Sequence, residues 1–179
     1  MDTATAPATG KRILVTGASG KIGQHVVRQL LDKGHAVVAL TSNPDLAVGR
    51  EPDRDVTWRH HDWRESVDFT EHVAGCDAVI HLGAEIWRID RMERVSIRAY
   101  GRSKVKAEDA IAAACRNTHF AVVRPTVVAD VDDIADAVNM NPLVKSIGAR
   151  RHTHFVYIAD VAAAMIWLME RGLSQAADM

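Results

Sequence analysis

The sequence has few of the features that mark several common classes of protein. Its 179 residues include only two cysteines, Cys76 and Cys115, which are too few for a disulfide framework or a thiolate metal site. Lysine and arginine together number 22 against 23 aspartates and glutamates, so the formal net charge is only −1. A chain this close to neutral has no long-range attraction to nucleic acid or to an anionic membrane surface, and we expect neither as a partner.

Signals for membranes, export and metals are also missing. No apolar run approaches the roughly 20 residues of a membrane-spanning helix. Residues 1–10 lack the basic and then apolar layout of a signal peptide, so we expect a flexible lead-in. The low cysteine content leads us to expect a reducing, cytoplasmic location. The nine histidines are scattered, or paired without other ligands nearby, which argues against a metal site.

What the sequence does contain is a regular alternation of short apolar runs and amphipathic stretches. Runs rich in β-branched residues predict strands, and a 3.6-residue apolar period predicts helices. The predicted strands cover residues 12–16, 36–40, 56–59, 78–82, 120–123 and 155–158. The predicted helices cover residues 21–33, 65–74, 100–115, 132–138 and 161–170. This alternation is typical of a parallel sheet with helices on both faces, so we predict a doubly wound α/β fold in three layers.

A glycine-rich turn, TGASGKIG at residues 16–23, lies between the first predicted strand and the first predicted helix. Gly17 and Gly20 permit a tight turn and a close backbone approach to a ligand, and Gly23 permits close packing of helix and sheet. The start of the helix adds N–H donors and a positive dipole end, a combination that binds phosphate. The turn therefore predicts dinucleotide binding; the alternative is a plain strand-to-helix connection without a ligand.

Further segments follow this turn in a recognisable order. They are HHDW with Asp62, CDAVIHLGA at residues 76–84, YGRSK at 100–104, RPTVV at 124–128 and FVYIADVAAAM at 155–165. Together with the opening VTGASGKIGQHVVRQLLDKGHAVVAL, they resemble the extended short-chain dehydrogenase/reductases of the epimerase/dehydratase branch. The resemblance covers nearly the whole chain. It implies one Rossmann-type NAD(P)-binding domain over residues 11–179, with little or no separate substrate domain and remnants of a substrate-binding part near residues 126–154.

The resemblance also implies which residues contact the cofactor. Asp62 matches a carboxylate that accepts a hydrogen bond from the adenine amino group, although it would equally cap a helix beginning near Arg64. Gly83 and Ala84 would let the backbone lie against the cofactor, or would simply form a tight turn. The predicted cofactor residues are Gly17, Ser19, Gly20, Lys21, Ile22, Gly23, Thr41, Ser42, Asp62, Trp63, Leu82, Gly83, Ala84, Tyr100 and Lys104.

The end of the second predicted strand bears on the choice between NAD and NADP. A carboxylate there would accept hydrogen bonds from the adenine ribose and favour NAD, but residues 40–43 read LTSN. Thr41 and Ser42 would hydrogen-bond either a ribose hydroxyl or a 2′-phosphate. Lys21 or Arg50 would supply a cation for that phosphate, unless both are ordinary solvated charges. The missing carboxylate leads us to expect NADP somewhat more than NAD.

Tyr100 and Lys104 are four residues apart, so on a helix both lie on one face. In the family that the chain resembles, the ammonium lowers the pKa of the phenol, which exchanges a proton with the substrate while hydride moves to or from nicotinamide. A phenol with a pKa of about 10 is too weak a base without such a cation. The resemblance therefore gives Tyr100 the acid/base role and Lys104 the role of adjusting its pKa.

One stretch departs from the family pattern. The family places a helix, a strand and a catalytic Ser or Thr between the fourth strand and the tyrosine, whereas only 16 residues separate Gly83 from Tyr100. Because a helix and a strand need more than about 20 residues, we expect a discontinuity near Ile97 and Arg98. Ser96 lies at a different position of the pattern, so we do not give it the hydroxyl role. Either the chain is a shortened member, or the sequence omits segments of a longer protein.

Two functions follow from these expectations. The first is an NAD(P)-dependent oxidoreductase or epimerase that acts on a secondary alcohol, a ketone or a nucleotide-linked sugar by hydride transfer. The second is a non-catalytic NAD(P)-binding module, such as a redox sensor or an assembly partner. The resemblance is also compatible with a homodimer.

Overall fold

The structure is a computed structural model that describes residues 10–43, 45, 56–62, 68–82, 97–115, 127–132 and 155–177. Within these ranges it does not describe the side chains of residues 97–104, 107, 127, 155 and 175–177. The lead-in at residues 1–9, the predicted strand at 120–123 and residues 133–138 of a predicted helix lie outside the described residues. The single-domain boundaries expected above therefore stay a prediction.

The centre of the molecule is a four-stranded, fully parallel sheet with the strand order β3-β2-β1-β4. Its strands are β1 (Arg12–Thr16), β2 (Ala36–Thr41), β3 (Val56–His60) and β4 (Ala78–His81). Each strand begins where the sequence predicted it and ends within one residue of the predicted position. A β1 that lies between β2 and β4 requires crossovers in both directions from the centre, as in a doubly wound sheet.

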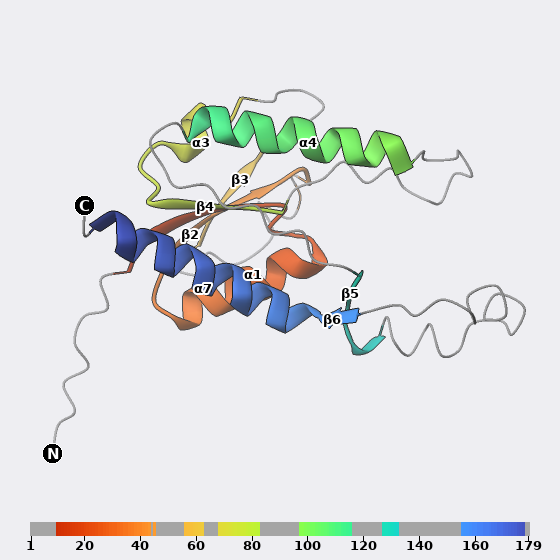
Figure 1. The fold of residues 1–179 in the computed structure, drawn as a ribbon. Helices are drawn as coiled ribbons and strands as arrows, with labels where there is room; N and C mark the ends of the chain where they lie inside the picture. The colour runs from red at the N-terminus through yellow and green to blue at the C-terminus, as the bar shows by residue number, and fades with distance from the viewer. Residues whose placement is uncertain are drawn as a thin grey trace, which may run out of the picture.

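Helices cover both faces of this sheet, as Figure 1 shows. On one face lie α1 (Lys21–Asp32) and α7 (Ile158–Ala177); on the other lie α3 (Thr70–Val73) and α4 (Ile97–Ala114). Three layers of helix, sheet and helix result, which confirms the predicted fold class.

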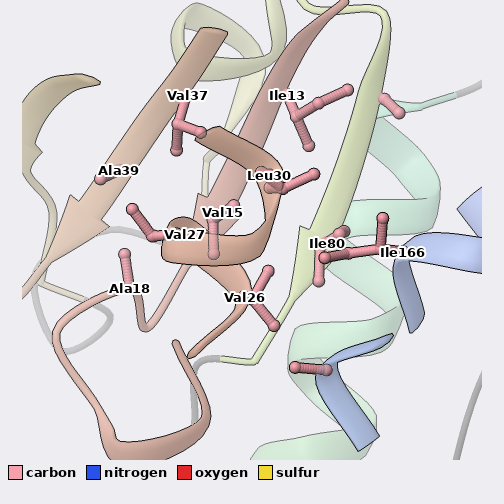
Figure 2. Close-up of a cluster of buried hydrophobic side chains, with 12 residues drawn as sticks. Ile13, Val15, Ala18, Val26, Val27, Leu30, Val37, Ala39, Ile80 and Ile166 are labelled. Atoms are coloured by element: carbon pink, nitrogen blue, oxygen red, sulfur yellow. The ribbon is translucent and has the colours of Figure 1, made fainter. Parts of the chain in front are cut away.

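Alternate side chains of β1 supply the two apolar clusters that hold the layers together. Ile13 and Val15 are fully buried towards α1 and α7, where they meet Leu30 and Ile166 (Figure 2). Leu14, between them in the sequence, points the other way into a second cluster. That second cluster also contains Val38, Leu40, Phe69, Ile111 and Cys115.

Helix α1 is built from a local pattern that the sequence displays clearly. Its buried residues are Gly23, Val26, Val27 and Leu30, which recur at the three- and four-residue spacing of one helix face. The helix ends two residues before Gly34, whose φ of 80° lies in the left-handed region that favours glycine. The N–H groups of Gly34 and His35 donate back to the carbonyls of Leu31 and Leu30, which closes the helix with a Schellman motif.

The helix predicted over residues 65–74 is shorter in the structure, where residues 65–67 lie outside the described ranges. Of residues 68–74, only Thr70–Val73 is helical, and Asp68 and Phe69 precede it. The side-chain oxygen of Asp68 accepts hydrogen bonds from the Thr70 hydroxyl at 2.6 Å and from the Thr70 N–H at 2.9 Å. These bonds lower the pKa of Asp68 and offer the backbone an alternative to a helical turn.

Three other differences concern the second half of the chain. Helix α4 begins at Ile97 rather than at residue 100, and so includes Ile97 and Arg98. The discontinuity expected there concerns the family pattern and stays a prediction. Helix α7 extends beyond the predicted residues 161–170 at both ends. Strands β5 (Val127–Ala129) and β6 (Phe155–Tyr157) form a separate parallel pair, and the sequence did not predict β5. No helix in the described ranges is long and apolar enough to cross a membrane.

Polar contacts fasten α7 to the end of α1. Both carboxylate oxygens of Glu170 accept hydrogen bonds from the Lys33 ammonium at 2.9 Å, and His35 Nε2 lies 3.3 Å from one of them. Burial raises the pKa of Glu170, but the hydrogen bonds and charges of Lys33 and His35 outweigh it and leave the pKa below its ordinary value.

Glu170→Gln is therefore expected to destabilise the protein slightly, and only where the carboxylate is charged. A group with a lowered folded-state pKa contributes stability above its unfolded pKa, near 4.5, and loses it as the pH falls through the folded value. Because the pair is partly exposed, the difference in the free energy of unfolding should stay below about 1 kcal/mol at pH 7. Urea unfolding at pH 7 and pH 3 tests this, since the two proteins should converge at the lower pH.

Candidate functional site

Polar residues gather where the parallel strands end, because the carboxyl ends of parallel strands meet at one edge of a sheet. The last residues of β1, β2, β3 and β4 are Thr16, Thr41, His60 and His81. Thr16 lies in register with His81, and Thr41 with His60. Both threonines are almost fully buried, so this edge carries polar groups inside the protein. In doubly wound folds, ligands bind outside this edge.

The glycine turn leaves β1 at this edge in a conformation that only glycine supports well. Gly17 has a φ of 65°, and its carbonyl accepts a hydrogen bond from the Gly20 N–H at 3.0 Å. A Cβ on Gly23 would lie 2.2 Å from the Gly17 carbonyl oxygen, and one on Gly20 would lie 3.2 Å from it. The Ala18 N–H donates to Leu40 O, which ties the turn to β2.

The start of α1 presents backbone donors at the end of this turn. Its N-cap, Gly20, makes no side-chain capping bond, and the first turn of the helix contains no acidic residue. The first N–H groups of an α-helix have no partner within the helix, so they and the helix dipole favour an anion. The residues present therefore fit the pyrophosphate of a dinucleotide, the ligand that the sequence predicted for them.

The end of β2 is connected to the turn through side chains. The hydroxyls of Ser19 and Thr41 share a hydrogen bond of 2.8 Å, and the Thr41 hydroxyl also accepts from the Asn43 N–H at 3.1 Å. The Thr41 hydroxyl is therefore engaged in hydrogen bonds within the protein, while the neighbouring Ser42 is exposed. Asp45 follows in the same loop, where its N–H donates to Asn43 Oδ1 at 3.0 Å.

Asp62 lies just after β3 and is buried, with 9% of its surface exposed. The preceding His61 N–H donates to Thr41 O at 2.9 Å, which continues the pairing of β3 with β2. The His61 ring lies 4.4 Å from the Phe69 ring and bonds to His72 at 3.1 Å. Burial, followed by the nearby Arg59, lowers the pKa of His72, which favours the neutral form of that ring at physiological pH.

A partly buried pair at the ends of β1 and β4 was not among the predicted site residues. Thr16 Oγ1 and His81 Nδ1 share a hydrogen bond of 2.6 Å. The Leu82 N–H donates to both the hydroxyl and the carbonyl of Thr16, each at 3.2 Å. Thr16 thus fixes the backbone that leads from β4 into residues 83–84. The available signal was a polar last residue on two otherwise apolar strands.

Thr16→Val should show how much this pair contributes. The change keeps the shape of the side chain but removes the hydroxyl from a buried site that includes His81. Loss of a buried hydrogen bond of this kind costs about 1–3 kcal/mol of unfolding free energy. Thr16→Ser keeps the hydroxyl and is the matched control in denaturant unfolding. Equal stability of the valine and serine variants would contradict the assignment.

A second contact that the sequence did not predict joins the glycine turn to β5. The ammonium of Lys21, the first residue of α1, lies 3.6 Å from a carboxylate oxygen of Asp130, which directly follows β5. The two side chains are 64% and 25% exposed. Lys21 thus lies against a carboxylate, and its predicted contact with the cofactor remains a prediction.

The predicted catalytic pair falls in α4, one helical turn apart, so both residues lie on one face of the helix. Their side chains lie outside the described residues, as do Trp63, Gly83 and Ala84. The far end of α4 packs on the sheet through Ile111, and Cys115, directly after the helix, lies in the same cluster with Leu14.

The described cysteines and histidines do not form a reactive or metal-binding group. Burial raises the pKa of both the Cys76 and the Cys115 thiol, so neither is a thiolate at neutral pH. Among the described residues, no three His, Cys, Asp or Glu side chains are grouped so that they could hold a metal ion.

Comparisons with known proteins agree with this geometry. Residues 13–123 match the model of the NAD dependent epimerase/dehydratase family, and the chain belongs to that family. It is 34% identical over 109 residues to 2-alkyl-3-oxoalkanoate reductase of Stenotrophomonas maltophilia, covering 59% of this chain and 29% of that protein. It is 35% identical over 79 residues to UDP-glucose 4-epimerase of Klebsiella pneumoniae, covering 40% of this chain and 57% of that protein.

A solved structure has the same fold. The UDP-N-acetylglucosamine 4-epimerase from Bacillus cereus superposes with a TM-score of 0.58 at 17% identity, over 92% of this chain and 73% of that one. The matched part of the chain covers less than two thirds of the length of each curated relative named above. The family and the fold predicted from the sequence are thus confirmed.

Proposed function

We propose that the protein is an NAD(P)-dependent oxidoreductase or epimerase that transfers hydride to or from a secondary alcohol, a ketone or a nucleotide-linked sugar. The observation that carries this proposal is the glycine turn at the carboxyl edge of the sheet. There Gly17 has a positive φ, and the space at Gly23 admits no side chain. Family membership and the names of the relatives, a reductase and an epimerase, support the same reaction class.

Different residues at this edge bind different parts of the cofactor. The backbone of residues 17–23 binds the pyrophosphate, Ser42 faces the adenine ribose, and the buried carboxylate of Asp62 accepts a hydrogen bond from the adenine amino group. Leu82, which Thr16 fixes, leads into the backbone that lies against the nicotinamide half. The bound nicotinamide supplies the hydride chemistry, which no side chain can perform.

In the proposed reaction, Tyr100 and Lys104 act on the substrate. Tyr100 exchanges a proton with the substrate oxygen as the hydride moves, and the ammonium of Lys104 stabilises the phenolate. Their positions one turn apart on α4 suit this division of roles.

The proposal favours NADP over NAD. No carboxylate stands among residues 40–43, and the hydroxyl of Thr41 is engaged by Ser19 and Asn43. The exposed Ser42 is left to bond the ribose or a 2′-phosphate. An acidic residue at the strand end would repel that phosphate, and its absence removes the usual barrier to NADP.

Calorimetric titration with NAD⁺, NADH, NADP⁺ and NADPH tests the proposal. We expect saturable binding of one pair or both, with the phosphorylated pair binding more tightly. Tighter binding of NAD and NADH would overturn the preference for NADP alone. No heat and no saturation with any of the four would overturn the function itself.

One observation favours a second candidate, a dinucleotide-binding module without chemistry. Residues 84–99 contain a single serine, Ser96, and no threonine. No residue in that stretch therefore matches the family's serine or threonine, whose hydroxyl polarises the substrate carbonyl. The two candidates differ in turnover: a module of this kind would bind the cofactor but turn over no alcohol, ketone or nucleotide sugar.

Sedimentation analysis of the chain would test the homodimer, and fractionation of cells would test the cytoplasmic location.

A further inference from the structure

The ion pair between Lys21 and Asp130 joins two distant parts of the sequence at the candidate cofactor site. Lys21 is the first residue of α1 and follows Gly20 of the glycine turn, whereas Asp130 follows β5. Figure 1 shows β5 beside the end of α1 at which the helix begins, and the 3.6 Å separation of the charged atoms agrees with that view. The pair therefore lies where the turn would bind phosphate.

Electrostatics make the position of Lys21 unusual. A cation in the first turn of a helix is disfavoured, because the helix dipole places positive charge there. The first turn of α1 contains no acidic residue and its N-cap makes no side-chain bond, so no carboxylate of that turn offsets the ammonium. Asp130 supplies a negative charge from another part of the fold. A bound pyrophosphate would supply the same kind of charge.

The pair is poorly suited to a purely structural role. With Lys21 64% exposed and Asp130 25% exposed, water screens much of the attraction. Ion pairs with such exposure typically contribute about 0–1 kcal/mol to stability. The pair should affect ligand binding more than stability, because a dinucleotide brings two negative charges to the same end of the helix.

We infer that Asp130 competes with the pyrophosphate of the cofactor for the ammonium of Lys21, and that this competition sets the affinity of the site. Without cofactor, the Asp130 carboxylate pairs with Lys21. When the dinucleotide binds, Lys21 turns to its phosphates and the ion pair with Asp130 opens. The inference rests on the proposed function, because it requires a pyrophosphate at the glycine turn.

Single substitutions should shift the dissociation constant in opposite directions. Asp130→Asn removes the competitor and should tighten cofactor binding severalfold. Lys21→Met removes the cation and should weaken it about tenfold, the effect of one nearby unit charge in a partly exposed site. In the K21M background, the D130N change should have less than a twofold effect, because Asp130 acts through Lys21. High salt should reduce each difference.

Two further variants separate competition from bracing. Lys33→Met removes an exposed lysine from the other end of α1, where its partner is Glu170, and should leave cofactor affinity unchanged. K21D combined with D130K restores an ion pair but places a carboxylate at the start of α1. The exchange should weaken binding more than K21M does, because the carboxylate at position 21 repels the pyrophosphate. If Asp130 and Lys21 only brace the fold, the exchange instead restores the unfolding temperature that K21D alone loses, and D130N does not tighten binding.

The measurement is calorimetry with the nucleotide that binds the wild-type chain most tightly, with thermal unfolding of each variant to show that it is folded. Tighter binding by D130N and weaker binding by the exchanged pair are the expected results. Wild-type binding with unchanged affinity in D130N would overturn the competition and leave the proposed function standing. A wild-type chain that binds none of the nucleotides would overturn the proposed function, and the competition with it.

Discussion

Gly23→Ala is expected to damage both the fold and the candidate cofactor site. The new Cβ would lie 2.2 Å from the Gly17 carbonyl oxygen and 2.7 Å from two backbone atoms of Ala18. Because all three are backbone atoms, the contact can be relieved only if α1 moves away from the turn. Overpacking of this kind costs about 1–3 kcal/mol of unfolding free energy.

The same movement should weaken dinucleotide binding roughly hundredfold, because a displacement of about 1 Å is enough to spoil a precisely placed set of contacts. Denaturant unfolding and calorimetry measure the two effects. Gly172→Ala in α7 is the matched control, since nothing lies within 4 Å of its added Cβ. It should stabilise the protein by up to about 1 kcal/mol, the usual gain over glycine in a helix. A Gly23→Ala protein with wild-type stability and affinity would contradict the packing described for the turn.

Tyr100→Phe is expected to reduce turnover about 100- to 10,000-fold while cofactor affinity changes little. The substitution removes only the phenol oxygen, which in the proposed reaction exchanges a proton with the substrate, and general acid–base catalysis contributes an effect of this size. The assay follows the absorbance of reduced nicotinamide with alcohol, ketone or nucleotide-sugar substrates. Calorimetry on the same protein separates a loss of chemistry from a loss of binding.

The chain offers a close control, because it contains only one other tyrosine. Tyr157 ends β6 and is 45% exposed, so Tyr157→Phe should leave both turnover and cofactor affinity unchanged. Turnover that survives in Tyr100→Phe would remove Tyr100 from the reaction. Equal losses in the two variants would show that the effect does not come from position 100.

The first half of the fold could be predicted from the sequence because its signals are local. The apolar run of β1, the glycine turn and the apolar period of α1 each lie within a few residues, and Gly34 marks the helix end directly. The position of the candidate cofactor site follows from that order alone, since parallel strands bring their carboxyl ends together. The resemblance to the family placed Asp62 and Leu82 at the same edge.

Contacts between distant segments could not be predicted in this way. Thr16 and His81 are 65 residues apart and meet only because β1 and β4 pair in parallel with a particular register. The pairing of β5 with β6 is also a tertiary event, and β5 is a three-residue strand whose sequence carries little signal of its own. The contact of Lys21 with Asp130 depends on that pairing in turn.

The short helix α3 is a different kind of error, because its signal was present. Asp68 followed two residues later by Thr70 is a pattern that bonds a side chain to the backbone and delays the start of a helix. The predicted helix covers the whole of residues 65–74. In the described part of that stretch, the side-chain hydrogen bonds determine where the helix begins.

The central claim is that the backbone of the glycine turn binds the pyrophosphate of a nicotinamide dinucleotide. Amide resonances in a ¹H–¹⁵N spectrum of the labelled chain, followed during titration with the dinucleotide, test it most directly. The chemical shifts of the amides of residues 17–23 and of Leu82 should change and saturate together, while those of the C-terminal half of α7 should not change. Saturable binding that leaves the amides of residues 17–23 unmoved would contradict the claim.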